Sequence, residues 1–188
     1  ERQSVIKPEL FAEIGRIPTS RNTMTYLRYA EALNRAGYPQ SAFLILKHGM
    51  CYDNLVVHVD SVERVAAAEL VDFDANIFPK DHTFGIHSRG SGDSHINEYY
   101  TLPMPTDSLA TRQDTIDYQI PLVEDMIIDE MALEGAFEGY RYYDLMRVAL
   151  RRNDASYLAA PISRRNGEED ATLRAKLEDT SNWYLPLP

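Results

Sequence analysis

Residues 123–152 mix acidic, basic and apolar side chains in one periodic pattern, which strongly limits how the chain can fold. If this segment is helical, with about 100° per residue, one face carries apolar side chains together with Glu134, Glu138 and Arg141. The opposite face is apolar as well. A helix that is apolar nearly all round is buried between neighbours, and its charges must be paired. Gly135 and Gly139 either let a neighbour approach closely, or Gly139 divides the segment into two helices.

Acidic residues recur in this segment at every fourth position, at Glu130, Glu134 and Glu138. Such a row would repel itself on an exposed helix, so we expect the last two and Arg141 to be largely buried and to share hydrogen bonds or ion pairs. Asp144 and Arg147 form a second pair at a spacing of three. The pairing favours a structural role, because acid/base catalysis needs two carboxyls with separated pKa values beside a cleft.

Residues 20–49 carry the signals of two antiparallel helices. The first is expected over residues 22–36, because Gly37 favours a helix end. The second is expected over residues 39–48, because Pro39 suits a first helical position. Aromatic, small and apolar residues fill the positions of a tetratricopeptide unit, namely Tyr26, Tyr29, Ala30, Leu33, Gly37, Ala42 and Leu46. One such unit needs a stacked neighbour to bury its apolar face, and the long charged helix would provide one.

Three segments together resemble the SusD/RagB family of outer-membrane nutrient-binding lipoproteins. The first, TYLRYAEALNRAGYPQSA over residues 25–42, resembles the helical hairpin that precedes the family signature. The second resembles that signature, E-x3-E-x3-E-G-x-R-x2-D-x2-R, and consists of Glu130, Glu134, Glu138, Gly139, Arg141, Asp144 and Arg147. The third, NWYLPLP over residues 182–188, resembles a segment close to the family's C-terminus. The three matches occur in the family's order and span most of the chain.

This resemblance implies a mainly α fold, with tetratricopeptide-like helical hairpins in a SusD-like helical bundle and long irregular loops. Residues 1–188 would form the C-terminal portion of such a domain, and the signature residues would be architectural. The implied function is to bind a glycan or other nutrient at the cell surface and to pass it to a SusC-like TonB-dependent transporter. Such a protein is no enzyme, needs no cofactor, and is held at the outer membrane by a lipid anchor that would lie upstream of Glu1.

Residues 73–118 are rich in Gly, Ser, Asp and Pro and show little periodicity. Loops of that length inside a compact domain are often functional, so we expect any ligand contacts of this chain to lie here. Tyr99 and Tyr100 would stack on a sugar ring, and Asn97 and Asp93 would bind its hydroxyls. The same stretch could instead form a network of turns. A metal site is a weaker alternative, since its spacing fits no compact zinc pattern; its ligands would be His82, His87, Asp93 and His95.

Three shorter signals concern the remaining elements. Asp60 and Glu63 form a capping-box pattern at the start of a helix that runs to Leu70. The stretch SRRNGEED predicts a turn, followed by a helix that ends near residue 177. Trp183 is expected to be a buried anchor for the tail and not an exposed sugar platform, because the neighbouring leucines would otherwise be exposed.

The formal net charge of −10 argues against nucleic acid or an anionic lipid surface as a partner. A neutral ligand is compatible with this charge. The single cysteine, Cys51, excludes an internal disulfide. Two other functional classes stay open, a helical-repeat scaffold that binds a protein or peptide partner and a carboxylate-dependent glycoside hydrolase. The hydrolase would require a pair of carboxyls that face one open cleft.

Overall fold

The structure is a computed structural model that describes residues 22–50, 60–72, 76, 86, 100–106 and 111–184. These residues form seven α-helices and two 3-10 helices, and the described part of the chain contains no strand. The mainly α class predicted from the sequence is therefore confirmed. No helix among the described residues is long and apolar enough to cross a membrane.

The predicted helix pair is confirmed to within one residue at its ends. α2 spans Asn22–Arg35 and α3 spans Pro39–His48, and the two helices pack against each other. The chain reverses at Gly37, whose φ of 93° is a conformation that glycine adopts most easily. Ala30 and Ala42 are fully buried, as expected of small side chains that let two helices approach closely.

The long charged segment forms two helices and not one. α7 spans Arg112–Glu134 and begins well before residue 123, because Thr111 and Asp114 form a capping box that the sequence interpretation missed. α8 spans Arg141–Arg152, and in the turn between the helices Gly139 has a φ of 81°. Phe137 in the same turn has a φ of 67°, and a positive φ is incompatible with a right-handed helical path. The single helix expected over residues 123–152 is therefore wrong, and the two helices are separated by the turn that contains Gly139. The irregular section likewise ends before α7, and not at residue 118.

The helix after Asp60 forms, but the predicted capping box does not. α5 spans Ser61–Ala66, and the Asp60 side chain accepts a hydrogen bond from the backbone N–H of Val62. A short 3-10 helix, η1, follows over Ala68–Leu70. Glu63 is fully buried and accepts from the N–H of Ser41 at 2.7 Å and from its hydroxyl at 2.8 Å. Glu63 therefore caps the first turn of α3, whose own N-cap residue makes no side-chain capping bond.

Three short helices complete the chain. α9 spans Ser156–Ser163 and was not anticipated from the sequence, whereas α10, spanning Ala171–Glu178, follows the predicted turn. The last element is the 3-10 helix η3, which spans Thr180–Trp183. Trp183 is buried, and its indole N–H donates to the carbonyl of Leu177 at 2.6 Å. The prediction of a buried tail anchor is confirmed.

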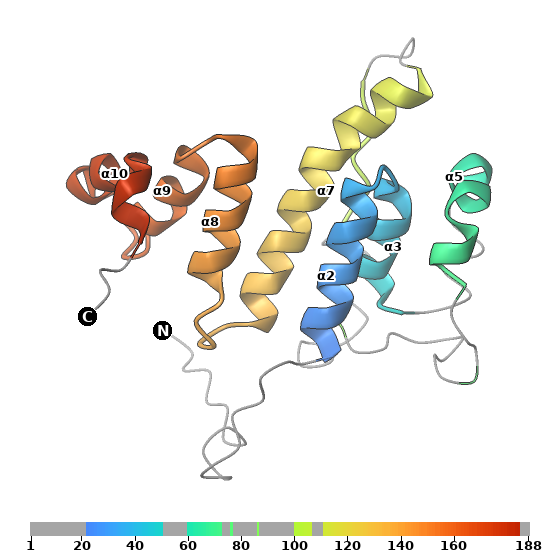
Figure 1. Cartoon of the computed structure of the whole chain (residues 1–188), viewed down its shortest axis with the longest axis horizontal. Helices are drawn as coiled ribbons and strands as arrows, with labels where there is room; N and C mark the ends of the chain where they lie inside the picture. The colour runs from blue at the N-terminus through green and yellow to red at the C-terminus, as the bar shows by residue number, and fades with distance from the viewer. Residues whose placement is uncertain are drawn as a thin grey trace.

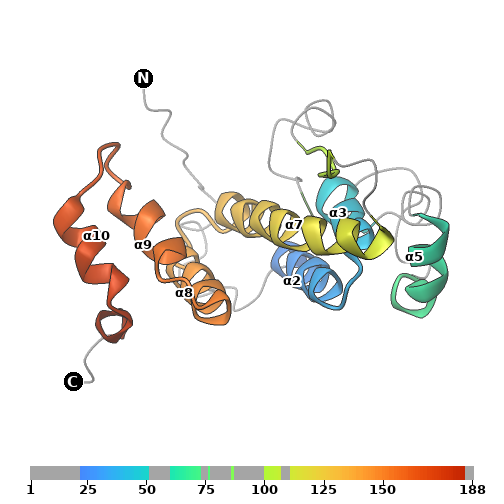
Figure 2. The same cartoon turned by 90° about the horizontal axis from the view of Figure 1, so that it is seen from above.

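The helices lie in one elongated row with α7 near its middle (Figure 1). In that view α2 and α3 lie on one side of α7 and α8 lies on the other, with α9 and α10 beyond α8 and α5 at the opposite end. Seen from above, α7 runs between α3 and α2 (Figure 2). The apolar core runs through this row and includes Leu27, Ile45, Ile127, Val148 and Leu158. α7 is thus packed on several sides, which explains why its apolar residues are not confined to one face of the helix.

Candidate functional site

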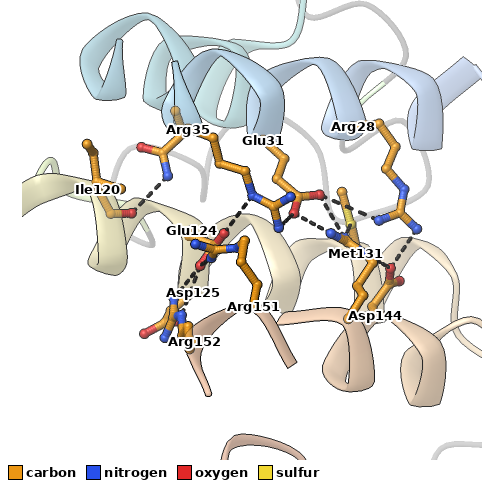
Figure 3. Close-up of polar contacts among 12 residues, drawn as sticks. Arg28, Glu31, Arg35, Ile120, Glu124, Asp125, Met131, Asp144, Arg151 and Arg152 are labelled. Atoms are coloured by element: carbon orange, nitrogen blue, oxygen red, sulfur yellow. Dashed lines mark hydrogen bonds and ion pairs between the residues drawn. The ribbon is translucent and has the colours of Figure 1, made fainter. Parts of the chain in front are cut away.

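An arginine–carboxylate network joins α2, α7 and α8, and Figure 3 shows its side chains converging between the three helices. We call this network the charged seam. It consists of Arg28, Glu31, Arg35, Glu124, Asp144, Arg147, Arg151 and Arg152.

Glu124 of α7 connects the end of α8 with α2. Its side chain is only 2% exposed and is ion-paired with three guanidinium groups. Arg35 donates to it at 3.0 Å and Arg152 at 2.9 Å, and Arg151 is the third partner. Burial raises the pKa of Glu124, but the hydrogen bonds and charges of these arginines lower it by more, so its net pKa lies below the ordinary range. Glu124 is therefore held as a carboxylate and joins the three helices.

Glu31 and Asp144 are the other two buried acids of the charged seam, and Arg147 bridges them. Its guanidinium donates to Glu31 at 2.7 Å and to Asp144 at 3.0 Å. Arg28 reaches Asp144 at 2.5 Å, and Arg35 pairs with Glu31. Burial lowers the pKa of Arg147, but its bonds with Glu31 and Asp144 raise the pKa by more. Every acid of the charged seam thus has at least two cationic partners, and the seam is structural.

The acidic row of the signature is arranged differently from the prediction. Glu134 is buried as expected, but Glu138 is only half-buried. Arg141 is 38% exposed, and it donates to Asp129 at 2.9 Å and to the carbonyl of Ile128 at 2.8 Å. The expectation that Arg141 is largely buried among the signature acids is therefore wrong. The reason is the turn before α8, because Arg141 begins a new helix and does not continue the face of α7.

Tyr100 occupies a core position and not the ligand-contact position that the sequence predicted. Its side chain is 4% exposed, and its hydroxyl donates to the buried carboxylate of Glu130. A ring buried in this way has no open face for a sugar. The other three predicted contacts, Tyr99, Asn97 and Asp93, lie outside the described residues, as do the candidate metal ligands His82, His87, Asp93 and His95. Within the described part of the chain, no group of three or more His, Cys, Asp or Glu side chains could hold a metal ion.

An open groove of about 730 Å³ runs along the side of α7 and is the candidate binding site. We call it the α7 groove. One wall is the extended segment of residues 101–104. The other wall is formed by side chains of α7, namely Tyr118, Leu122, Asp125, Met126 and Asp129.

The extended wall of the α7 groove is fixed at both ends. At one end the Tyr100 hydroxyl donates to Glu130. At the other, the side-chain amide of Gln119 donates to the Pro103 carbonyl at 2.9 Å and contacts the Met104 sulfur at 3.4 Å. Gln119 is fully buried, so these contacts lie beneath the groove. Residues 101–104 therefore run antiparallel to α7 and are held against it at both ends.

The α7 groove combines apolar surface with two carboxylates. Leu122 and Met126 lie one turn apart on α7, and Tyr118 is 44% exposed one turn earlier. Asp125 and Asp129 are also one turn apart, with side chains that are 42% and 70% exposed. Such a surface can hold the apolar face of a polar ligand and bind its donor groups.

One oxygen of each groove aspartate is occupied by contacts to residues outside the groove. Asp125 Oδ1 accepts from Arg152 at 2.7 Å and from the Tyr157 hydroxyl at 3.0 Å. Burial and the neighbouring charge of Asp125 raise the pKa of Tyr157, which therefore acts as a neutral donor. Asp129 Oδ1 accepts from Arg141. Among the described residues no contact involves the second oxygen, Oδ2, of either aspartate.

The section in which the sequence predicts ligand contacts supplies part of the lining of this groove. The prediction placed these contacts within residues 73–118, and that section supplies residues 101–104 and Tyr118. It did not include the α7 wall, because the helix expected from residue 123 onward was assigned to packing. The sequence does contain a signal for this wall, because two sets of residues recur at intervals of four. One set is apolar and the other acidic, so a helix places the two stripes side by side: Tyr118, Leu122 and Met126, and Asp125 and Asp129.

Comparisons of the chain with protein-family models, with curated proteins and with solved structures find no match.

Proposed function

We propose that this protein is a nutrient-binding lipoprotein of SusD/RagB type, which binds a glycan at the cell surface and passes it to a SusC-like TonB-dependent transporter in the outer membrane. The observation that carries the proposal is the sequence itself: three separate segments resemble that family, in the family's order. A lipid anchor would hold the protein on the cell-surface side of the outer membrane.

The helical arrangement supports an architectural role for the signature. Asp144 and Arg147 belong to the charged seam, and Glu130 is a buried partner of Tyr100. The helix pair that resembles a tetratricopeptide unit packs against α7, the helix that carries the first part of the signature. The first two matching segments thus lie next to one another, which supports a scaffold role for them and leaves ligand binding to other residues.

The α7 groove is the site at which we propose that the nutrient binds. Its apolar floor and the half-exposed ring of Tyr118 suit the nonpolar face of a sugar, and the two aspartates suit its hydroxyls. The groove is open along its length, which suits a chain-like ligand. The surfaces of the α2–α3 pair, by contrast, are packed against α7 and α5, so they favour a scaffold within the protein over a groove for a peptide.

Glycoside hydrolysis is the second candidate, because Asp125 and Asp129 face one open groove. A hydrolase needs two carboxyls in contrasting environments, so that one can donate a proton while the other is ionised. Here both aspartates lie on the exposed side of the same helix, and each is ion-paired with one arginine. This similarity favours binding without cleavage.

The proposal can be tested by isothermal titration of the chain against a panel of neutral, acidic and amino oligosaccharides, with chromatography of each sample after prolonged incubation. The expected result is saturable binding of at least one oligosaccharide, which is recovered intact. Absence of binding across the panel would overturn the proposed function. Cleavage that is abolished by Asp125→Asn or Asp129→Asn would instead establish the hydrolase.

A further inference from the structure

We infer that the α7 groove selects oligosaccharides that carry a free primary amine, and thus binds amino sugars in preference to neutral or acidic ones. This inference rests on the proposed function, since it takes the ligand to be a glycan, and it specifies the chemical class of that glycan. Its basis is the pair Asp125 and Asp129, whose carboxylates each bond an arginine through one oxygen only and lie beside apolar side chains.

The first step of the argument concerns the unused carboxylate oxygens. Asp125 and Asp129 are four residues apart on α7, so they project from the same face about one turn apart. Arg152 and Arg141 hold the Oδ1 atoms, which fixes the orientation of the two carboxylates. In the described structure both Oδ2 atoms are left for other donors. An ammonium donor adds a Coulombic attraction to the hydrogen bond with such a carboxylate, whereas a neutral hydroxyl makes the hydrogen bond alone.

The second step concerns the sign of the charge in the groove. Its lining contains Asp125 and Asp129 and, among the described residues, no lysine, arginine or histidine. The whole chain also carries a net charge of −10. Arg152 and Arg141 pair with these aspartates from outside the lining, so the preference rests on the unused Oδ2 atoms. These atoms accept from an ammonium group but offer no donor to a uronic acid or a sulfated sugar.

The third step concerns the rest of the ligand. A simple cation would need only the two carboxylates, but the groove also offers Leu122, Met126 and the ring of Tyr118. Aromatic rings accept both the nonpolar face of a sugar and a nearby cation. A glucosamine unit has both features on one ring. The combination of an apolar floor, a tyrosine and two carboxylates therefore favours an amino sugar over a bare metal ion or a neutral hexose.

The test is to titrate the chain with a glucosamine tetrasaccharide and, separately, with its fully N-acetylated counterpart. The pH is chosen so that the amines are protonated and the aspartates ionised. The two ligands share a backbone and differ in charge. We expect the free amine to bind about tenfold or more tightly, which corresponds to about 1.4 kcal/mol. We also expect this difference to shrink as salt is added, because salt screens charges at exposed sites.

Matched variants assign the effect to the groove. Asp129→Asn should weaken binding of the free amine about three- to tenfold, whereas Asp117→Asn, an equal change of charge elsewhere on α7, should not. Tyr118→Ala should weaken both ligands, whereas Tyr143→Ala, which removes an exposed tyrosine of α8, should weaken neither. Thermal melts would verify that each variant is folded.

Each outcome of this experiment has a definite meaning. If the acetylated ligand binds equally well or better, or Asp129→Asn changes nothing, the preference for amines is overturned while the proposed function stands. If a tetralysine peptide binds as tightly as the amino sugar with the same sensitivity to Asp129→Asn, the groove recognises charge and not sugar, which also overturns the inference. If no oligosaccharide of any kind binds, the proposed function itself fails.

Discussion

Glu124 and Asp125 are neighbours on α7, yet the fold gives them opposite environments. Glu124 is 2% exposed and is surrounded by three arginines of the charged seam. Asp125 is 42% exposed, shares a single arginine, and lines the α7 groove. One residue of helical rotation, about 100°, separates a carboxylate that joins helices from one that is open to a ligand. Two acidic neighbours in the sequence thus differ in burial and in the number of their cationic partners, which only the fold determines.

The largest expected effect comes from removing a bridging cation of the charged seam. Arg147→Ala takes away the guanidinium that Glu31 and Asp144 share, and both acids are almost completely buried. Glu31 keeps Arg28 and Arg35, and Asp144 keeps Arg28, but each buried carboxylate loses a hydrogen-bonded cation. We therefore expect the free energy of unfolding to fall by about 3 kcal/mol, as measured by urea denaturation. Arg174→Ala is the control, since Arg174 pairs only with more exposed acids of the C-terminal region. Equal losses in the two variants would contradict the special role of the seam.

A smaller effect is expected at Arg141, where the prediction from sequence alone would be a large one. The helical pattern places Arg141 among buried acids, but its actual partner Asp129 is 70% exposed. Exposed ion pairs contribute little, and the hydrogen bond to the Ile128 carbonyl adds a modest amount. Arg141→Ala should therefore lower the free energy of unfolding by only about 1 kcal/mol. A loss as large as that of Arg147→Ala would show that Arg141 stabilises the buried signature acids, as the helical pattern predicts.

The smallest effect concerns a third kind of carboxyl, that of Glu63, which is buried and has no cationic partner among the described residues. Burial raises the pKa of Glu63 above its ordinary value of 4.5, and hydrogen bonds from Ser41 offset only part of this. A raised pKa means that the folded state holds the proton more tightly than the unfolded state. The stabilising contribution of protonated Glu63 is thus present below pH 4.5 and is lost as the pH rises through the folded pKa.

Glu124 has the opposite sign, because its net pKa is lowered. The stabilising contribution of ionised Glu124 is present at a pH above the ordinary pKa of a glutamate, and it is lost as the pH falls through the lower pKa of the folded state. The parent protein should lose stability as the pH rises above 4.5, because folded Glu63 then gives up its proton. We expect Glu63→Gln to lack this loss, as measured by urea midpoints over a pH series. Glu69→Gln, at an exposed position of η1, is the control. An unchanged pH profile in Glu63→Gln would show that Glu63 keeps its usual pKa.

The parts of the fold that were predicted well from the sequence are those that single turn-forming or capping residues specify. Gly37 and Pro39 set the reversal of the helix pair, and Asp170 begins α10. Trp183 was recognised as buried because exposure of the apolar tail would be unfavourable. In each case the preference of one or two residues agrees with the packing around them.

The parts that failed depend on contacts between distant residues. The spacing of Asp60 and Glu63 matches a capping box, but the Glu63 carboxylate instead accepts hydrogen bonds from Ser41, which lies in α3. The start of α7 was missed because that helix is buried on several sides and contains Pro121, so it lacks a clear amphipathic period. The α7 groove exists only because residues 101–104 lie against α7, held through Gln119, and no local pattern specifies that pairing.

The division of roles along α7 can be tested most directly by urea unfolding of Glu124→Gln and Asp129→Asn, each with and without the glucosamine tetrasaccharide. The midpoint without ligand reports stability, and the shift caused by ligand reports binding. We predict that Glu124→Gln lowers the midpoint, by about 2 kcal/mol in free energy of unfolding, and keeps the ligand-induced shift. Asp129→Asn should keep the parent midpoint and lose most of the shift. A stable Glu124→Gln, or an Asp129→Asn that unfolds early while responding fully to ligand, would contradict the assignment of structure to one carboxylate and binding to the other.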